Sequence, residues 1–123
     1  MVMSIRSYQQ RVREWVAACF PRSSTNDRLE RSHRFLEEAI ELAQAAGCSK
    51  DDAIALVYYV FSRPVGDALQ ETGGVMVTLS ALCDVQAIDL EEASERELAR
   101  NWDRIDLIRS KQASKPHGSA LPQ

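Results

Sequence analysis

Apolar residues recur at helical spacing along nearly the whole chain, and no Asn-Gly or Asp-Gly turn separates runs of β-branched residues. This pattern predicts an all-α fold, a bundle of about five helices with a core like that of a four-helix bundle. The predicted helices cover residues 4–20, 27–46, 51–62, 67–86 and 89–111.

Local signals mark the breaks between these helices. Pro21 ends the first one, because proline cannot continue a helix interior, and residues 22–26 are predicted to form a loop. Gly47 fits the left-handed position that follows a helix C-terminus. Two residue pairs resemble the capping boxes that open helices: Ser49 with Asp52, and Asp89 with Glu92.

The chain has 123 residues, which is enough for one domain with a core of its own. We expect a single domain over residues 1–111 and a flexible, polar tail over residues 112–123. Residues 51–62 are apolar nearly all round, which is typical of a helix at the centre of a bundle or at a subunit interface. We therefore expect a homodimer or a homotetramer.

The charge balance and the cysteines limit the classes of partner. A net charge of −3 argues against a nucleic-acid-binding protein, which needs a basic excess to bind phosphates. The longest apolar run, residues 53–61, is shorter than the roughly 20 residues that span a bilayer, and no signal peptide is recognisable, so we expect no membrane partner. Cys19, Cys48 and Cys83 are scattered in apolar patterns, so we expect reduced thiols and a cytoplasmic protein.

Three glutamates on the second predicted helix form the most informative pattern. At about 100° per residue, Glu37 and Glu41 lie about 40° apart and Glu38 and Glu41 about 60° apart, so the carboxylates share one arc. Like charges at this spacing repel, and a hard cation such as Mg²⁺ or Mn²⁺ would offset the repulsion. The alternative is a solvated polar face on which Arg34 pairs with Glu37 and Glu38.

Glu71, on the fourth predicted helix, favours the metal interpretation. It falls at the border of an apolar stripe that holds Met76 and Cys83, so we expect it near the packed face. That helix has no lysine or arginine, and a buried carboxylate needs pairing, protonation or a metal ion. If the second and fourth helices pack as neighbours, the carboxylates of both meet across the interface. The alternative is an exposed residue at a helix edge.

The Glu-Glu-x-x-Glu motif that begins at Glu37, followed after one spacer helix by Glu71, resembles the MazG-type all-α nucleoside triphosphate pyrophosphohydrolases. The resemblance covers roughly residues 29–111. It implies a Mg²⁺-dependent, house-cleaning enzyme that cleaves a (deoxy)nucleoside triphosphate to a monophosphate and pyrophosphate. Two alternatives remain: a phosphohydrolase acting on a phosphoribosyl nucleotide, and a helical oligomerisation or regulatory module that has lost catalysis.

The resemblance also implies a role for each glutamate. Glu38, Glu41 and Glu71 would hold Mg²⁺, with Mn²⁺ as a possible substitute. Glu37 would hold a further ion, or would orient or deprotonate the attacking water.

The chain departs from the family pattern at its second motif. That motif is Glu-x-x-Asp, whereas here Glu71 is followed at the fourth position by Gly74, so one ligand is missing. Asp67 lies one turn before Glu71 and could supply the missing carboxylate. The alternative is that Asp67 is simply an acidic residue at a helix N-terminus, where negative charge is favourable.

Cationic side chains are needed to bind the phosphates of such a substrate. The substrate-binding candidates are Arg34, Arg104, Arg109 and Lys111, with Lys115 in the tail. The alternative for the C-terminal group is an ordinary solvated helix end, where cations are also favoured.

Overall fold

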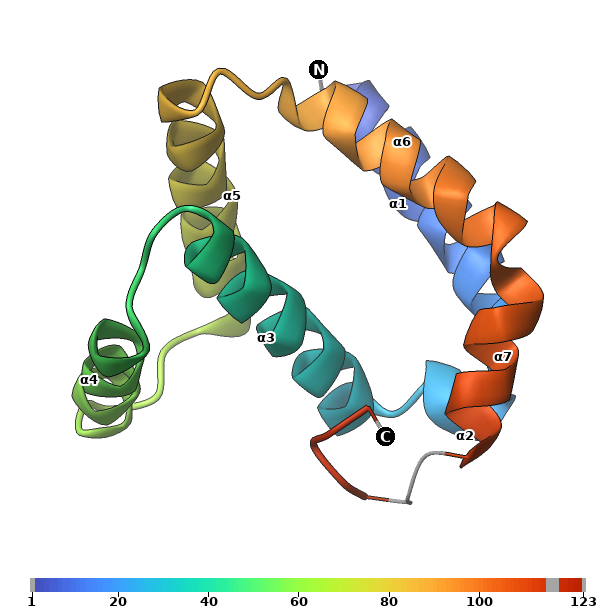
Figure 1. Cartoon of the computed structure of the whole chain (residues 1–123), viewed down its shortest axis with the longest axis horizontal. Coiled ribbons are helices and arrows are strands. Elements are labelled where there is room, and N and C mark those ends of the chain that lie inside the picture. The colour runs from blue at the N-terminus through green and yellow to red at the C-terminus, as the bar shows by residue number, and fades with distance from the viewer. Residues whose placement is uncertain (1, 115–117, 123) are drawn as a thin grey trace. The chain divides into compact units, whose positions relative to one another are not determined.

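The computed structural model describes residues 2–114 and 118–122, with side chains from Tyr8 onward. The described residues form seven helices and no strand, which confirms the all-α prediction (Figure 1). The helices are α1 (Val2–Cys19), α2 (Arg22–Thr25), α3 (Arg28–Ala45), α4 (Lys50–Phe61), α5 (Ala68–Val85), α6 (Leu90–Asp103) and α7 (Ile105–Ser114).

Two predicted segments differ from the structure. Residues 22–26, predicted as a loop, contain α2, because the carbonyl of Pro21 accepts hydrogen bonds from the amides of Ser24 and Thr25 and so begins a helical turn. The single predicted helix 89–111 is divided at Arg104 into α6 and α7. There the Arg104 amide is shared between the carbonyls of Arg100, at 3.1 Å, and Asn101, at 3.2 Å, which tightens the last turn of α6.

The helix ends follow the local signals closely. Gly47 has φ 101°, and the Cys48 amide donates to the Ala43 carbonyl at 2.9 Å, so the predicted left-handed cap of α3 is confirmed. The Ser49 hydroxyl accepts from the Asp52 amide at 3.1 Å, and Asp89 accepts from the Glu92 amide at 2.9 Å. Both predicted capping residues are therefore confirmed.

The chain forms two compact units, each described here by itself. The first unit contains Met1–Glu37 and Ser94–Gln123, and the second contains Glu38–Ala93. The boundaries fall within α3 and α6. The predicted start of the tail at residue 112 falls within α7, while residues 115–117 and 123 of that tail lie outside the described residues.

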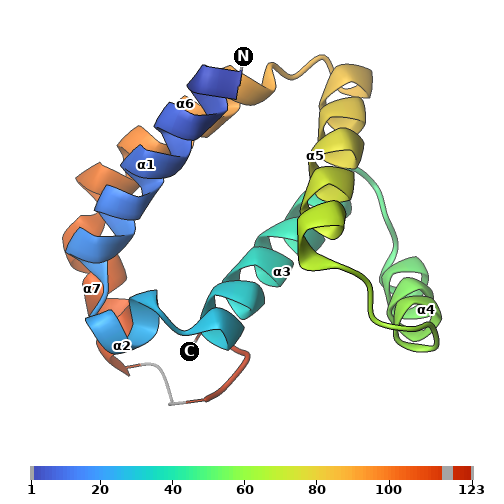
Figure 2. The same ribbon diagram turned by 180° about the vertical axis from the view of Figure 1, so that it is seen from behind.

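In the first unit, α1 lies alongside α7 and the part of α6 that begins at Ser94 (Figure 2). Arg11 binds Glu95, and the Tyr8 hydroxyl donates to the Ser94 carbonyl at 3.0 Å, so polar contacts tie α1 to α6. Arg109 on α7 donates to the Ala18 carbonyl near the end of α1. Contacts between residues distant in sequence thus hold this unit together.

The second unit has very little core. Cys83 is its only buried apolar residue among those described, and α4 has no buried residue at all. In both ribbon views α4 stands apart from α3 and α5, to which two loops connect it (Figures 1 and 2).

No single helix in the described part of the chain has the length and hydropathy of a membrane-spanning segment. The consecutive helices α5 and α6 meet that test only when they are taken together as a bent pair.

Candidate metal and nucleotide site

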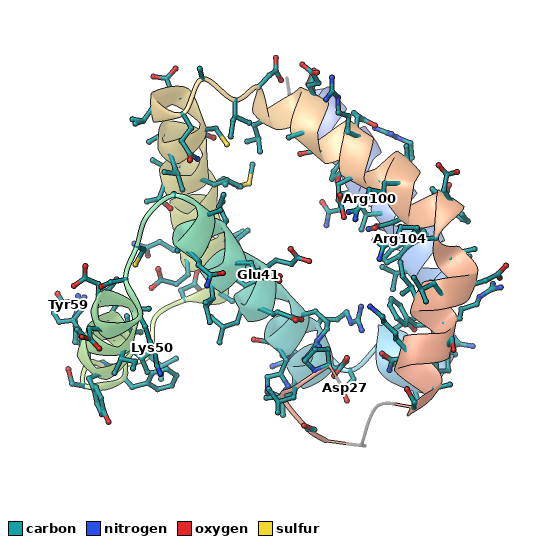
Figure 3. All side chains as sticks on the ribbon, viewed as in Figure 1. Asp27, Glu41, Lys50, Tyr59, Arg100 and Arg104 are labelled. Atoms are coloured by element: carbon teal, nitrogen blue, oxygen red, sulfur yellow. The ribbon has the colours of Figure 1, made fainter. Side chains whose placement is uncertain are left out.

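The glutamate motif lies on one continuous helix. Asp27 begins α3, because its Oδ1 accepts from the amides of Leu29, at 3.0 Å, and Glu30, at 3.1 Å. Glu38 and Glu41 are exposed, and the Glu41 side chain projects outward from α3 (Figure 3). The regular helix α3 therefore presents the carboxylates of Glu38 and Glu41 to solvent.

Glu37 forms an ion pair within the first unit. Arg34 Nη1 lies 3.2 Å from Glu37 Oε1, so the ion pair that the sequence allowed is present. Arg34 Nη2 also donates to the Ala120 carbonyl, and its Nε lies 3.6 Å from Glu30 Oε2. Arg34 thus orients Glu37 and at the same time joins α3 to residues near the C-terminus.

Glu30 is a buried acid that the sequence did not single out. Its side chain is only 7% exposed and lies 3.6 Å from both Arg31 and Arg34. Burial lowers the pKa of Arg31, whose guanidinium also lies 4.7 Å from the centre of the Phe20 ring. The spacing of Arg34 one turn after Glu30 could have predicted their ion pair from the sequence. That spacing does not predict that Glu30 is buried.

Glu71 lies in the first turn of α5, near the loop that precedes the helix. The expectation that it lies near the packed face is wrong for the single chain, because its side chain is exposed whereas Met76 is half-buried and Cys83 is buried. At the helix N-terminus no other element of the second unit covers it. A Cβ on Gly66 would lie 2.2 Å from Glu71 Oε2, so the carboxylate occupies space that any larger residue at position 66 would need.

Asp67 is the N-cap of α5. Its Oδ2 accepts from the Gln70 amide at 3.0 Å, which matches the helix-terminus alternative. This bond leaves Oδ1 as a donor atom for a cation. A capping role and a ligand role are therefore compatible for this residue.

The predicted carboxylates are not gathered into a cage by the single chain. Among the residues that the structure describes, no group of three or more His, Cys, Asp or Glu side chains could hold a metal ion. Glu38, Glu41 and Glu71 belong to the same unit but to different helices, α3 and α5. As exposed carboxylates they have the hard oxygen donors that Mg²⁺ prefers, so their chemistry fits the ion and the metal site stays a prediction.

The predicted phosphate-binding cations all lie in the first unit. Arg109 donates through Nε, at 3.1 Å, and through Nη2 to the Ala18 carbonyl, so it satisfies the C-terminal end of α1. Arg104 is half-buried at the break between α6 and α7, and Lys111 is exposed on α7. Lys115 lies outside the described residues. Arg34 and Arg109 therefore have structural contacts in addition to their predicted role in binding phosphate.

A shallow groove between α1 and α6 lies elsewhere in the first unit. Its volume is about 280 Å³, and none of the predicted site residues lines it; the lining residues are Arg11, Glu14, Glu95, Leu98, Ala99 and Trp102. The hydrogen bond from Arg11 lowers the pKa of Glu95 and raises that of Arg11. Burial, with a further contribution from Glu95, raises the pKa of Tyr8. The paired residues of α1 and α6 lie more than 80 positions apart along the chain, so no local sequence pattern identified the groove.

Comparison with known proteins adds no assignment to this geometry. No family model matches the chain, and no match is found among curated proteins or among solved structures. What the fold defines is therefore an all-α protein, and any function has to be argued from its residues.

Proposed function

We propose that this chain is a Mg²⁺-dependent nucleotide pyrophosphohydrolase that cleaves (deoxy)nucleoside triphosphates to monophosphates and pyrophosphate in a house-cleaning role. The observation that carries the proposal is the Glu37, Glu38 and Glu41 motif on the regular helix α3, with Glu38 and Glu41 exposed. Carboxylates at this helical spacing repel each other, and a bound divalent cation would offset that repulsion.

In this proposal Glu38, Glu41 and Glu71 hold the ion, and Asp67 contributes through Oδ1 while Oδ2 caps α5. A bound divalent cation neutralises phosphate charge and lowers the pKa of a water ligand. Glu37, held by Arg34 at 3.2 Å, orients or deprotonates the attacking water. Arg34, Arg104, Arg109 and Lys111 are the candidates for binding the phosphates.

The proposal includes a core like that of a four-helix bundle, which would bring the carboxylates of α3 and α5 together. Both helices contain 18 residues, long enough to form such a core. Cys19, Cys48 and Cys83 are free thiols, which supports a cytoplasmic location. We propose neither a nucleic acid nor a membrane as a partner.

Turnover of a nucleotide panel tests the proposal. The purified protein is incubated with Mg²⁺ or Mn²⁺ and with NTPs, dNTPs and a phosphoribosyl nucleotide, and pyrophosphate and monophosphate are measured. Glu38→Gln and Glu41→Gln should each lose activity on the order of 100-fold, the scale for removing a group that stabilises charge in the transition state. Glu97→Gln is the matched control, because Glu97 is an exposed glutamate that pairs with Arg100 on α6, outside the predicted site.

One observation favours a second candidate, a module without catalysis. Gly74 occupies the place of the family aspartate, and the described residues of one chain form no metal cluster. Absence of turnover on every substrate, together with no Mg²⁺-dependent rise in melting temperature, would support this module and contradict the hydrolase.

A further inference from the structure

The groove between α1 and α6 combines an aromatic face, an apolar base and an unbalanced charge. All of its lining residues belong to the first unit. They include one cation, Arg11, and two carboxylates, Glu14 and Glu95, so their net charge is −1. Leu98 is 6% exposed and forms the base, whereas Trp102 is 41% exposed. The groove therefore offers a surplus carboxylate beside an indole ring that solvent can reach.

The register of the two helices places Glu14 and the Trp102 ring at the same level. The contacts from α1 to α6 and α7 come in the same order along both segments, so these helices run parallel; they join Tyr8 to Ser94, Arg11 to Glu95, and Ala18 to Arg109. Three residues beyond the Arg11–Glu95 pair on each helix, about 4.5 Å along the axis, Glu14 lies level with Leu98. Helical side chains lean toward the helix N-terminus, so the Trp102 ring covers the turn that contains Leu98.

Arg11 is already neutralised within the groove. Both of its terminal nitrogens donate to Glu95, and this hydrogen bonding lowers the pKa of Glu95, so the pair stays ionised at neutral pH. Glu14, in contrast, is exposed and forms no hydrogen bond or ion pair within the described residues. A ligand in the groove therefore meets a carboxylate without a direct partner, which favours a cation over an anion.

Trp102 favours the same kind of ligand. Three other aromatic rings of the chain have an arginine guanidinium over them, at 5.6, 4.7 and 5.0 Å from the ring centre: those of Tyr8, Phe20 and Tyr59. No cation of the described residues lies over Trp102, although an indole attracts cations more strongly than a phenyl or phenol ring does. Its exposed ring can therefore make this contact with a cation from outside the chain.

A guanidinium group suits the groove better than an ammonium group. It is planar, so one face can stack on an indole while its edge donates two parallel hydrogen bonds to a carboxylate. An aliphatic stem attached to it would contact Leu98 and Ala99. The groove volume of about 280 Å³ is close to the lower end of the range for small-molecule sites, about 300–1,000 Å³, which indicates a small compound.

We propose that this groove binds a small guanidino compound, with the guanidinium stacked on Trp102 and paired with Glu14, and with its aliphatic stem on Leu98 and Ala99. These four residues define the guanidinium site. The proposal is independent of the proposed hydrolase activity, because none of the four belongs to the predicted metal and nucleotide site, and its test needs no turnover.

NMR titration of the indole N–H signals tests the proposal on the full chain. The chain has two tryptophans, and loss of one signal in Trp102→Phe identifies that of Trp102. N-acetylargininamide should shift the Trp102 signal of the wild-type protein with a Kd of about 1 mM, the affinity expected for a ligand of this size. N-acetylcitrullinamide is the matched ligand control, because it has a similar shape but no charge, and it should bind about tenfold more weakly.

Glu14→Gln should raise the Kd for N-acetylargininamide about fivefold, because it removes the charge but leaves the Arg11–Glu95 pair in place. Glu97→Gln, which changes an exposed glutamate outside the groove, is the matched control and should keep the wild-type Kd. Inorganic phosphate should leave the Trp102 signal unchanged, because Arg11 is paired.

Four outcomes would overturn the proposal. The first two are an unshifted Trp102 signal at about 10 mM N-acetylargininamide, a range that covers the expected Kd, and equal affinity for the citrulline compound. The others are an unchanged Kd in Glu14→Gln and a shift caused by phosphate. An arginine within a glycine peptide should bind no more tightly than N-acetylargininamide, and tighter binding of the peptide would overturn the assignment to a small compound.

Discussion

Arg11 Nη1 donates to Glu95 Oε1 and Arg11 Nη2 to Glu95 Oε2, each at 2.5 Å, although the two residues are 84 positions apart. This bidentate pair joins α1 to α6, next to the hydrogen bond from Tyr8 to the Ser94 carbonyl. It is accessible to solvent, with side chains 41% and 42% exposed, so its contribution to stability is modest.

Glu95→Gln should lower the melting temperature at neutral pH, and the effect should become smaller in acid. The hydrogen bond from Arg11 lowers the pKa of Glu95 in the folded protein. A carboxyl group with a lowered folded-state pKa stabilises the protein above its unfolded-state pKa of about 4.3, and the stabilisation is lost as pH falls through the folded-state value. Thermal unfolding of both proteins at pH 7 and at pH 3 measures the difference. A gap as large at pH 3 as at pH 7 would contradict an ionic origin, and Glu97→Gln should change little at either pH.

Ala87→Gly should stabilise the protein by about 0.5–1 kcal/mol, because glycine adopts positive φ without the steric cost that alanine has. Ala87 has φ 57° just after α5, where the Ile88 amide donates to the Cys83 carbonyl at 2.9 Å. Chemical denaturation measures the change. Ala93→Gly, an exposed position within α6, is the control and should destabilise by a similar amount. Equal losses in the two variants would show that Ala87 is not strained.

Asp67→Asn separates the capping role of this residue from its proposed role as a metal ligand. Asparagine caps helices about as well as aspartate, so stability should stay close to that of the wild type, whereas Asp67→Ala should cost about 1 kcal/mol. The neutral amide is a weaker ligand for Mg²⁺, so Asp67→Asn should raise the Mg²⁺ concentration needed for half-maximal turnover. An unchanged Mg²⁺ requirement would leave Asp67 as a cap alone.

Gly66→Ala should displace the carboxylate of Glu71. The added Cβ would lie 2.2 Å from Glu71 Oε2, and because this is the end of a flexible side chain the protein should fold with little loss of stability. If Glu71 holds the ion, the Mg²⁺ requirement should rise. The same substitution in a Glu71→Gln background is the control, and there it should have no further effect. An equal effect in both backgrounds would show that position 66 acts independently of Glu71.

The sequence by itself determined the helices and most of their ends, because these depend on neighbours within one turn. Gly47, Ser49 and Asp89 were identified as capping residues from sequence alone, and their contacts reach at most five residues along the chain. The break at Arg104 was missed because no glycine or proline marks it. The glutamate motif on α3 could be recognised for the same reason as the caps, since helical spacing alone places its carboxylates on one arc.

Only the tertiary structure decided which groups are buried and which distant groups meet. Glu30 and Glu71 both lie in the first turn of a helix, yet Glu30 is 7% exposed between two arginines and Glu71 is exposed. Periodicity predicts a face of a helix but not what covers that face, because the cover comes from residues far along the chain. The Arg11–Glu95 pair is one such distant contact. The apolar surface of α4 is exposed because no such contact covers it within the described second unit.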